Sequence, residues 1–538
     1  MALSTTSRLT RRTLLRAGAV LAGASALPLL AACSGGSTAS PTAAPAATTA
    51  PAPTQAAAAT AAPTAAAAAT AAPTTAAAPT TAAAAATAAP TTAAAATTTS
   101  STAPQAVAFD PKTVKMNGSF KVIQQKDWNP LHNAYLQKFV QDTGKGWGWN
   151  VDISYEAAFT GGSNFFQKMA AAVSSGQGPD MVWGNYDTFQ MWYLKIVQPV
   201  DDVVAAMTKS LGDPSPGFAI GGNKIDSKWW SVPYFNRTGG WFARKSWFAA
   251  KNIDITTLKD FNQWRDAAVQ ITDATKRQWG WGATVNRSGD GESWVQNAWF
   301  ETGNRLTDET GQKVTFDTDL SVQAFTWLKD LYTNPKYVPG MPPGILAWDD
   351  MGNNNAWNAG TIGFTSNAGT LFAAGLKTVP QIGNDTFMVN QPAMPIGEKQ
   401  QLVGSAGTGA TFYLMAGAKN PDAMKAMTEQ MLNQDVQTKL FGYSQGYVTP
   451  GYTWGWDTKE VTTCPNNVDL IYKEIVFNKN QFAGYLPAPN PLLWVSGVNQ
   501  AVVFTDTMAA ILKGTAVADA VKQGQTKIEA IAKQFNYK

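Results

Sequence analysis

The sequence predicts an α/β fold for the part of the chain that begins at about Met116. Short apolar runs alternate there with segments in which apolar residues recur at helical spacing, which is typical of α/β proteins. The charges mark where this part starts. Residues 33–108 carry no charge, whereas about 109–538 carry all 37 acidic residues and all but four of the 41 basic ones. We therefore expect one folded part of about 430 residues, preceded by two segments of other kinds.

Residues 1–32 have the pattern of an export signal, with a basic start, an apolar middle and small residues at the end. The run TRRTLLR at residues 10–16 resembles the twin-arginine export signal, although Leu and Arg stand where Phe and Lys are commoner. A general secretory signal with an incidental pair of arginines is the alternative. All four charges of the segment are arginines: Arg8, Arg11, Arg12 and Arg16. Either signal predicts export from the cytoplasm.

The end of this signal, Leu30-Ala31-Ala32-Cys33, resembles a lipobox, the site at which bacterial lipoproteins are cleaved and lipidated. Lipidation of Cys33 would leave Cys464, the other of two cysteines, as an unpaired thiol. We therefore expect the chain to be lipid-anchored on the extracytoplasmic face of the cell membrane.

Residues 33–108 are almost entirely Ala, Thr and Pro after the lipobox cysteine. A segment without large apolar side chains cannot form a core, and its scattered prolines interrupt any helix. We expect a disordered linker, which at about 3.1 Å per residue could extend roughly 200 Å. The sequence thus predicts a domain that works at a distance from its anchor.

The charge balance and the few reactive side chains disfavour several classes of function. With 37 basic and 37 acidic residues, the folded part lacks the cationic excess that nucleic acids and anionic membranes attract. One histidine, His132, and two cysteines are too few for a Cys/His zinc cluster, and a Ser-His-Asp mechanism would have to use His132. No apolar stretch after residue 32 reaches the length of about 20 residues that spans a bilayer. We expect no metal and no other cofactor.

The individual elements follow from apolar periodicity and from end signals. Alternation predicts a strand at 151–155, for example, and Gly176 ends a helix that Asn164 caps. The predicted strands are 119–123, 151–155 and 179–183. The predicted helices are 131–142, 164–175, one that starts near 257, 422–432, 498–512 and 516–535. Asp180, inside the third strand signature, is interpreted as structural.

Seven motifs follow one another through this part of the chain. They are Phe166–Met169 with Ser175–Val182, Leu194–Asp202, Trp230–Tyr234, Trp247–Trp264, Asn358–Phe364, Lys419–Ala423 and Lys513–Ala520. In this order they resemble the extracellular solute-binding proteins of bacterial ABC importers, of the sugar-binding type. The resemblance covers essentially all of 117–538. One motif departs from the family pattern, because Thr361 stands where the family has Lys.

The resemblance implies a two-lobed, type II-like periplasmic-binding-protein fold with hinge strands between the lobes. It places lobe one at 117–232 plus 362–408, and lobe two at 236–358 plus 410–538. A ligand would bind between the lobes and close them about the hinge. The resemblance further implies a monomeric binding protein, not an enzyme, that delivers a mono- or oligosaccharide to ABC permease subunits in the membrane.

Candidate ligand contacts follow from the strand order, since ligands of open α/β sheets bind outside the carboxyl ends of the strands. Asp127 and Trp128 come after the first predicted strand, and Tyr186 and Asp187 come after the third. Carboxylates accept hydrogen bonds from sugar hydroxyls in a planar, bidentate way, so the two aspartates are the first choices. The resemblance places polar sugar contacts at the same two loops.

Aromatic side chains supply most of the remaining candidates. All 20 tryptophans lie between Trp128 and Trp494, and the flat face of an indole suits the C–H face of a sugar. The alternative for any one tryptophan is core packing. Loops near the expected crossovers and the late helices give seven further candidates: Tyr234, Glu292, Trp294, Trp299, Trp348, Asn367 and Trp494.

Three other functions compete with sugar binding. A receptor for a polyamine or a peptide would also use acidic groups with aromatic walls. A surface glycoside hydrolase would need paired carboxylates about 5–10 Å apart, for which Asp127, Asp187 and Glu292 are available. A sensor that presents its ligand to a signalling partner would share the same cleft.

Overall fold

The computed structural model describes residues 107–127, 130–156, 162–237, 239–311, 313–397, 409–477 and 493–534. The predicted export signal, Cys33 and nearly all of the predicted linker lie outside these residues, as does Trp128. In the described part, none of the helices combines the length and the apolar character needed to cross a bilayer.

The first sheet has six strands in the order β12-β6-β11-β3-β1-β2. Their bounds are β1 Phe120–Gln125, β2 Val151–Glu156, β3 Met181–Gly184, β6 Val232–Arg237, β11 Gly409–Leu414 and β12 Val448–Pro450. β1 runs parallel to β2 and β3, while β11 runs antiparallel to both β3 and β6. Consequently β1, β3 and β6 all end at the same edge of the sheet.

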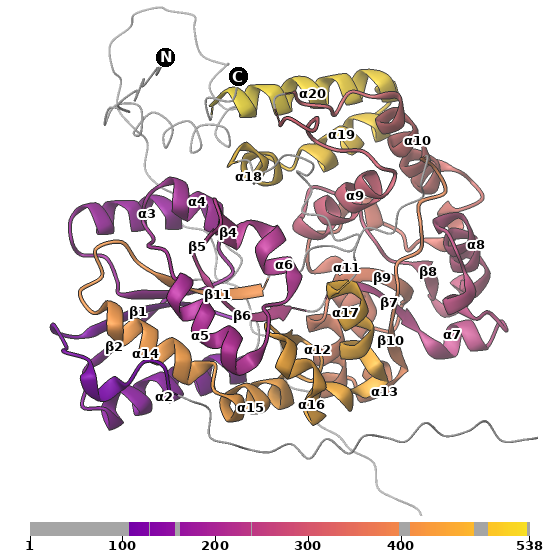
Figure 1. Ribbon diagram of the computed structural model, residues 1–538. Coiled ribbons are helices and arrows are strands. Elements are labelled where there is room, and N and C mark those ends of the chain that lie inside the picture. Colours follow the sequence, from indigo (N-terminus) through magenta and orange to yellow (C-terminus); the bar gives the residue numbers. More distant parts are fainter. Residues whose placement is uncertain are drawn as a thin grey trace, which may run out of the picture. The chain divides into compact units, whose positions relative to one another are not determined.

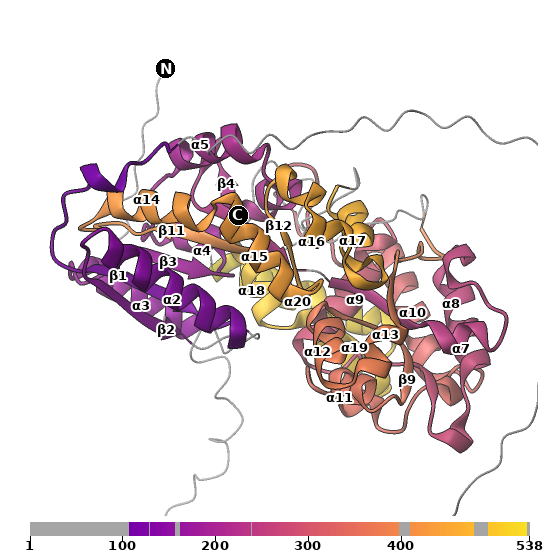
Figure 2. The same cartoon turned by 90° about the horizontal axis from the view of Figure 1, so that it is seen from below.

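Helices from distant parts of the chain cover this sheet. They are α2 Pro130–Gly146, α3 Gly162–Ser174, α4 Thr188–Tyr193, α5 Asp201–Leu211, α6 Pro216–Phe218, α14 Pro421–Met431 and α15 Gln434–Ser444, with a β4 Lys224–Ile225 and β5 Lys228–Trp229 hairpin. Figure 1 shows the orange α14 and α15 next to the indigo α2, and Figure 2 shows β11 beside β3. Asp180 ties these segments together, accepting from the backbone N–H of Lys121 at 2.9 Å and of Asn420 at 2.8 Å.

The second sheet has four strands in the order β10-β7-β9-β8. Their bounds are β7 Gly239–Arg244, β8 Trp279–Trp281, β9 Ile362–Ala368 and β10 Thr386–Val389. β9 runs parallel to β8 and antiparallel to β7. The carboxyl end of β9 therefore lies at the start of β7, where Ala368 pairs with Gly239.

The second sheet and its helices enclose an aromatic core. The helices are α7 Lys245–Ala249, α8 Phe261–Ile271, α9 Gly289–Glu301, α10 Asp319–Thr333, α11 Gly352–Asn358, α12 Thr370–Thr378, α13 Pro380–Asp385, α17 Val468–Val476, α18 Leu493–Gln500, α19 Val503–Leu512 and α20 Val517–Gln534, with α16 Lys459–Thr462 leading in from α15. Trp241 stands at the centre and contacts the rings of Trp264, Trp281 and Trp294. Such large, closely packed rings dominate the burial of apolar surface in this half of the molecule.

The α/β fold class is confirmed, but the sheets divide the chain differently from the predicted lobes. The prediction put 362–408 in lobe one and 410–538 in lobe two. β9 and β10 instead pair with β7 in the second sheet, and β11 and β12 pair with β6 in the first. The physical reason is that β11 and α14 bury their apolar faces against β3 and α2, so this late segment returns to the first lobe.

One predicted helix, 498–512, is two helices. Val502 between α18 and α19 has φ 46°, in the left-handed region that a β-branched residue rarely adopts. The new helix start leaves free backbone N–H groups, and the Glu292 carboxylate accepts from two of them, Phe504 N at 3.1 Å and Thr505 N at 2.8 Å. This cap ends one helix and begins the next.

A carboxylate on α14 attaches the first described residues of the chain to the first lobe. Glu429 of α14 accepts hydrogen bonds from the backbone N–H groups of Ala108 at 2.7 Å and Phe109 at 2.8 Å. Two successive amides held by one buried side chain fix the first described residues on α14, on the first lobe.

Candidate functional site

Two sheet edges border the crossover between β6 and β7. β6 ends at Arg237 and β7 begins at Gly239, so the edge at which β1, β3 and β6 end lies next to the edge at which β9 ends. A second crossover returns to the first lobe at Gly409, where a Cβ atom would lie 1.8 Å from the carbonyl oxygen of Phe235. Only glycine fits this close backbone approach. Polar side chains that follow these strand ends are the candidates for binding a solute.

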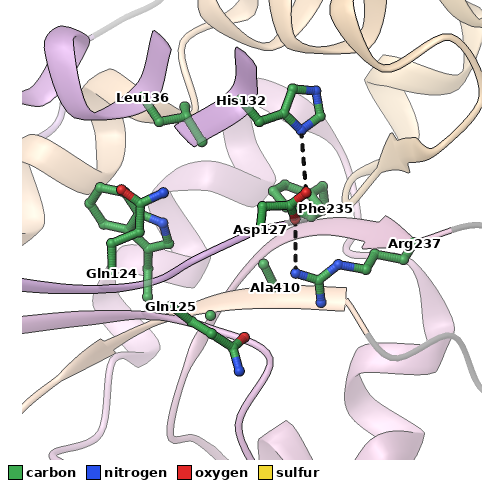
Figure 3. A pocket seen from close by; sticks show the side chains of 10 residues that line it. Gln124, Gln125, Asp127, His132, Leu136, Phe235, Arg237 and Ala410 are labelled. Atoms are coloured by element: carbon green, nitrogen blue, oxygen red, sulfur yellow. Dashed lines mark hydrogen bonds and ion pairs between the residues drawn. The ribbon is translucent and has the colours of Figure 1, made fainter. Parts of the chain in front are cut away.

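Asp127, just after β1, lies between Arg237 and His132 (Figure 3). Its Oδ2 accepts from Arg237 Nη2 at 3.1 Å and from the Tyr447 hydroxyl at 3.3 Å, and Arg237 Nε donates to the same hydroxyl at 2.9 Å. The Asp127 side chain is 7% exposed and that of Arg237 is 11% exposed. The predicted ligand carboxylate is therefore a buried ion pair between the β1 loop and the end of β6.

His132, in the first turns of α2, faces the same carboxylate. Its Nδ1 lies 4.0 Å from Asp127 Oδ1, and neither ring nitrogen has a hydrogen-bond partner in the described part of the chain. Burial lowers the pKa of His132, which Asp127 opposes and Arg237 reinforces. Next to it is a cavity of about 10 Å³, lined by Gln124, Gln125, Asp127, His132, Leu136, Trp183, Gly184, Phe235, Arg237 and Ala410. That volume holds about one water molecule.

The loop after β3 is organised by its own side chains. Tyr186 stacks on Phe165, with ring centroids 4.0 Å apart and an interplanar angle of 12°. Burial raises the pKa of Tyr186, and its hydroxyl has no hydrogen-bond partner among the described residues. Asp187 caps α4 by accepting from the backbone N–H of Gln190 at 3.0 Å. Both candidates thus lie at the expected edge, and both also have a local structural task.

Tyr234, in the middle of β6, lies within the first lobe. It is fully buried and packs against Phe235 and Phe412, with ring centroids 4.6 and 4.3 Å away. Two residues further on, the buried Asn236 donates to the carbonyl oxygen of Pro450 at 2.6 Å. These contacts hold β6 and β12 together where the chain crosses to the second lobe.

The second edge carries a cluster of one carboxylate and three amides, which we call the Asp290 cluster: Asp290, Asn353, Asn354 and Asn367. Asp290 Oδ2 accepts from Asn353 Nδ2 at 2.8 Å and from Asn367 Nδ2 at 3.5 Å, and Asn367 Nδ2 lies 3.3 Å from Asn354 Oδ1. Burial raises the pKa of Asp290 to about 6; the bond from Asn353 lowers it, and the nearby Asp350 carboxylate raises it. In the described chain no basic side chain forms an ion pair with Asp290.

Trp348 lies in the loop that joins this cluster to the core. Its carbonyl oxygen accepts from Asn286 Nδ2 at 3.1 Å, and the backbone N–H of Asp290 donates to Asp350 Oδ1 at 2.8 Å. The ring is partly exposed and packs against buried hydrophobic clusters. The ring of Trp348 therefore lies in the loop that leads into α11, the helix that carries Asn353 and Asn354 of the Asp290 cluster.

Comparison with known proteins decides the family. Residues 128–438, more than half of the chain, match the model of the bacterial extracellular solute-binding protein family. The chain belongs to this family. No curated protein matches the sequence of this solute-binding protein.

Solved structures of solute-binding proteins share the fold at low sequence identity. The D-mannitol-bound protein of an ABC transporter from Agrobacterium vitis S4 is 17% identical, with a TM-score of 0.60 over 78% of this chain and 100% of that one. A sugar transporter from Arthrobacter chlorophenolicus A6 with bound laminaribiose is 15% identical, with a TM-score of 0.58 over 77% and 99%. The GacH receptor of Streptomyces glaucescens, studied with acarbose, is 18% identical, with a TM-score of 0.57 over 78% and 100%. These similarities confirm the two-lobed fold.

Four sequence candidates lie in the core of the second lobe of this solute-binding protein. Glu292 caps α19, as described above. The indole N–H groups of Trp294 and Trp299 donate to Tyr332 Oη at 3.1 Å and Ser321 Oγ at 2.7 Å. Trp494 is 2% exposed in the same hydrophobic cluster. Their contacts are those of core and capping residues, and we leave them out of the proposed site; Trp128 lies outside the described residues.

The sequence reasoning selected Asn367 and Trp348 but not the other members of the second edge. Two signals were present. Asp290 stands in Gly289-Asp290-Gly291 at the start of a helix, and the run Asn353–Asn355 follows Trp348 within a few residues. What brings them together is the parallel pairing of β8 and β9, which the sequence pattern did not predict. In the described residues, no group of three or more His, Cys, Asp or Glu side chains is placed to hold a metal ion.

Proposed function

We propose that this solute-binding protein captures a mono- or oligosaccharide between the two sheet edges and delivers it to an ABC permease. The observation that carries the proposal is the Asp290 cluster, in which one carboxylate and three amides meet at the end of β9. Asp290 accepts there from neutral amides rather than from a cation, which leaves its charge for hydroxyl donors of a ligand.

The chemistry of the cluster suits a neutral polyhydroxylated ligand. A sugar hydroxyl donates one hydrogen bond and accepts others, and an amide side chain can do both in one plane. Specific binding sites combine a few such polar groups with aromatic walls, and Trp348 supplies an aromatic face in the same loop system. Solved structures that share the fold carry D-mannitol and laminaribiose, which supports the same ligand class here.

Tryptophan fluorescence of the full chain tests this proposal. Titration with D-mannitol, laminaribiose and acarbose should change the emission with at least one of them in a saturable way. Asn367→Ala should weaken that binding at least tenfold, equivalent to about 1.4 kcal/mol, without unfolding the chain. A matched control is Asn334→Ala, which removes an amide that donates to Asp330 at the end of α10, outside the Asp290 cluster. Absence of a response to every carbohydrate would count against the proposal.

A polyamine receptor is the second candidate, and one observation favours it. The Asp350 carboxylate raises the pKa of the Asp290 carboxyl, so two acidic groups lie close together with no paired cation in the described chain. A polyamine would neutralise both, and its binding would weaken steeply with added salt. Spermidine in the same titration, at low and high salt, separates the two ligand classes.

We further propose that the protein is a monomeric lipoprotein, exported by a twin-arginine signal and anchored through Cys33. The support is the lipobox-like Leu30–Cys33 with the arginine pair before it. Cys33→Ser should release the chain from the membrane fraction, and continued retention would refute the anchor. We propose no enzymatic activity, because Asp127, Asp187 and Glu292 are each engaged by structural partners.

A further inference from the structure

Side chains tie the loop before α9 to the loop before α11 in the second lobe. Thr284 Oγ1 donates to the carbonyl oxygen of Ile345 at 2.8 Å, and Asn286 Nδ2 donates to that of Trp348 at 3.1 Å. Each contact joins a side chain of the first loop to the backbone of the second. The two loops are therefore held together on the way to the Asp290 cluster.

Asp350, in the loop before α11, extends this connection into the cluster itself. Its Oδ1 accepts from the backbone N–H of Asp290 at 2.8 Å, and its carbonyl oxygen accepts from Asn354 Nδ2, also at 2.8 Å. Asn354 Oδ1 in turn lies 3.3 Å from Asn367 Nδ2. Asp350 is not a member of the cluster, yet it holds two of the four members from outside.

The contact with Asp290 is made at the start of a helix. The N–H of Asp290 lies in the first turn of α9, where backbone N–H groups have no partner within the helix. Ser288 Oγ accepts from the N–H of Gly291 at 3.0 Å, and Asp350 accepts from that of Asp290. Gly289 permits the close approach, because a Cβ atom there would lie 3.3 Å from both oxygens of the Asp350 carboxylate. The start of α9 is thus capped from its own loop and from the loop before α11.

Asp350 also acts on Asp290 through its charge. Burial raises the pKa of Asp290 to about 6, the bond from Asn353 lowers it, and the Asp350 carboxylate raises it. The basic residue nearest in sequence, Arg287, pairs with Asp506 at 3.1 Å instead. The contact and the charge of Asp350 can be separated by substitution, because an Asn side chain keeps an oxygen acceptor and carries no charge.

We propose that Asp350 is a positioning residue of the solute site, which holds Asp290 and Asn354 so that their polar groups can bind a sugar. The inference rests on the proposed function, because Asp350 affects a solute only if the solute binds at the Asp290 cluster. The contacts of Asp350 hold the cluster, and its charge tunes the protonation of Asp290.

Hydrogen exchange at the backbone amide of Asp290 tests the contact in the full chain without any ligand. Asp350→Ala removes the acceptor, so we expect the protection factor of this amide to fall at least about tenfold. Asp350→Asn should restore most of the protection, since its side-chain oxygen can accept the same bond. The amide of Gly291, which donates to Ser288, should keep its protection in both variants. An Asp290 amide that is equally protected in Asp350→Ala and in wild type would overturn the proposal.

Fluorescence titration with laminaribiose, D-mannitol and acarbose tests the effect on the site. For a sugar that binds the wild type, Asp350→Ala should weaken binding at least about tenfold, and Asp350→Asn should recover most of that loss. As pH falls, Asp350→Asn should lose its binding at a lower pH than wild type does. The reason is that the missing carboxylate no longer raises the pKa of Asp290, which stays ionised to lower pH.

Asp349→Ala is the matched control. This neighbouring, exposed carboxylate accepts from the backbone N–H of Met351 at 3.0 Å and, among the described residues, from no member of the Asp290 cluster. It should bind sugar like wild type. Equal weakening in Asp349→Ala and Asp350→Ala would overturn the proposal, and so would wild-type binding in Asp350→Ala. If the wild type binds none of the three sugars, the proposed function fails and the role of Asp350 in sugar binding fails with it, whereas the exchange result still decides the contact.

Discussion

The two edges that border the crossover each carry an aspartate, and the two aspartates differ in their partners. Asp127 in the first lobe is paired with Arg237 and Tyr447. Asp290 in the second lobe accepts from Asn353 and Asn367, which are neutral, and burial raises its pKa to about 6. The ion pair with Arg237 stabilises the position of Asp127. In the described chain Asp290 forms no ion pair with a cation, so its carboxylate can accept a hydrogen bond from a ligand.

This difference indicates a division of work between the lobes. We propose that the first edge holds the geometry near the crossover and that the second edge supplies hydrogen-bonding groups for the ligand. Each of the following predictions tests that division.

The largest expected effect is on stability, in the first lobe. Arg237→Met removes the guanidinium that pairs with the Asp127 carboxylate, and breaking such a buried ion pair costs about 3–5 kcal/mol of unfolding free energy. The double variant Asp127→Asn, Arg237→Met removes both charges and should recover part of that loss. Denaturant unfolding measures both, and an unchanged midpoint in Arg237→Met would show that the pair does not hold the edge.

The second prediction concerns the pH dependence of stability in the second lobe. The folded pKa of Asp290 is about 6, above the usual value near 3.9 of an unfolded chain. The unfolded state therefore loses its proton first, and the free energy of unfolding falls as pH rises from about 4 to 6, by up to about 3 kcal/mol. We expect Asp290→Asn to lack this part of the fall. The difference between wild type and variant across pH isolates Asp290 from other buried acids such as Glu301.

The smallest effect is on binding alone. Trp348→Ala removes the partly exposed ring near the Asp290 cluster and should weaken carbohydrate binding about tenfold, or about 1.4 kcal/mol. Trp294→Ala is the contrasting variant, because loss of a fully buried tryptophan costs about 3–5 kcal/mol of stability. Fluorescence titration measures the binding of both variants, and thermal unfolding measures their stability. If both variants lose the same amount of stability, Trp348 is a core residue.

The sequence predicted those parts of the fold that depend on local periodicity. The strands at 151–155 and 179–183 and the structural role of Asp180 correspond to β2, β3 and the hydrogen bonds of Asp180. The predicted helix 164–175 corresponds to α3, but α3 begins at Gly162, so Asn164 lies inside the helix and does not cap it. The split at Val502 was not predicted, because the cap that starts α19 comes from Glu292, over two hundred residues earlier. The lobe division failed for a related reason, since β11 pairs with strands that are more than 170 residues away.

The candidate site depends less on local periodicity than the fold does. Strand-end reasoning reached Asp127, Tyr186 and Asp187, and all three lie at the expected edge. It could not show that Arg237 takes the carboxylate of Asp127, because that contact joins residues 110 positions apart. Counting tryptophans was least informative, since an indole suits a core and a cleft equally well, and Trp294 and Trp299 are core residues here.

The attachment of Ala108 and Phe109 to Glu429 has a mechanical consequence. A force that pulls on the chain before residue 107 acts first on the two hydrogen bonds from backbone N–H groups to Glu429 of α14, and so on the first sheet. This force does not act directly on the crossover at 237–239 or on the second sheet. If the lobes turn about the crossover, as we expect from the family resemblance, the attachment can therefore bear tension without opposing that turn.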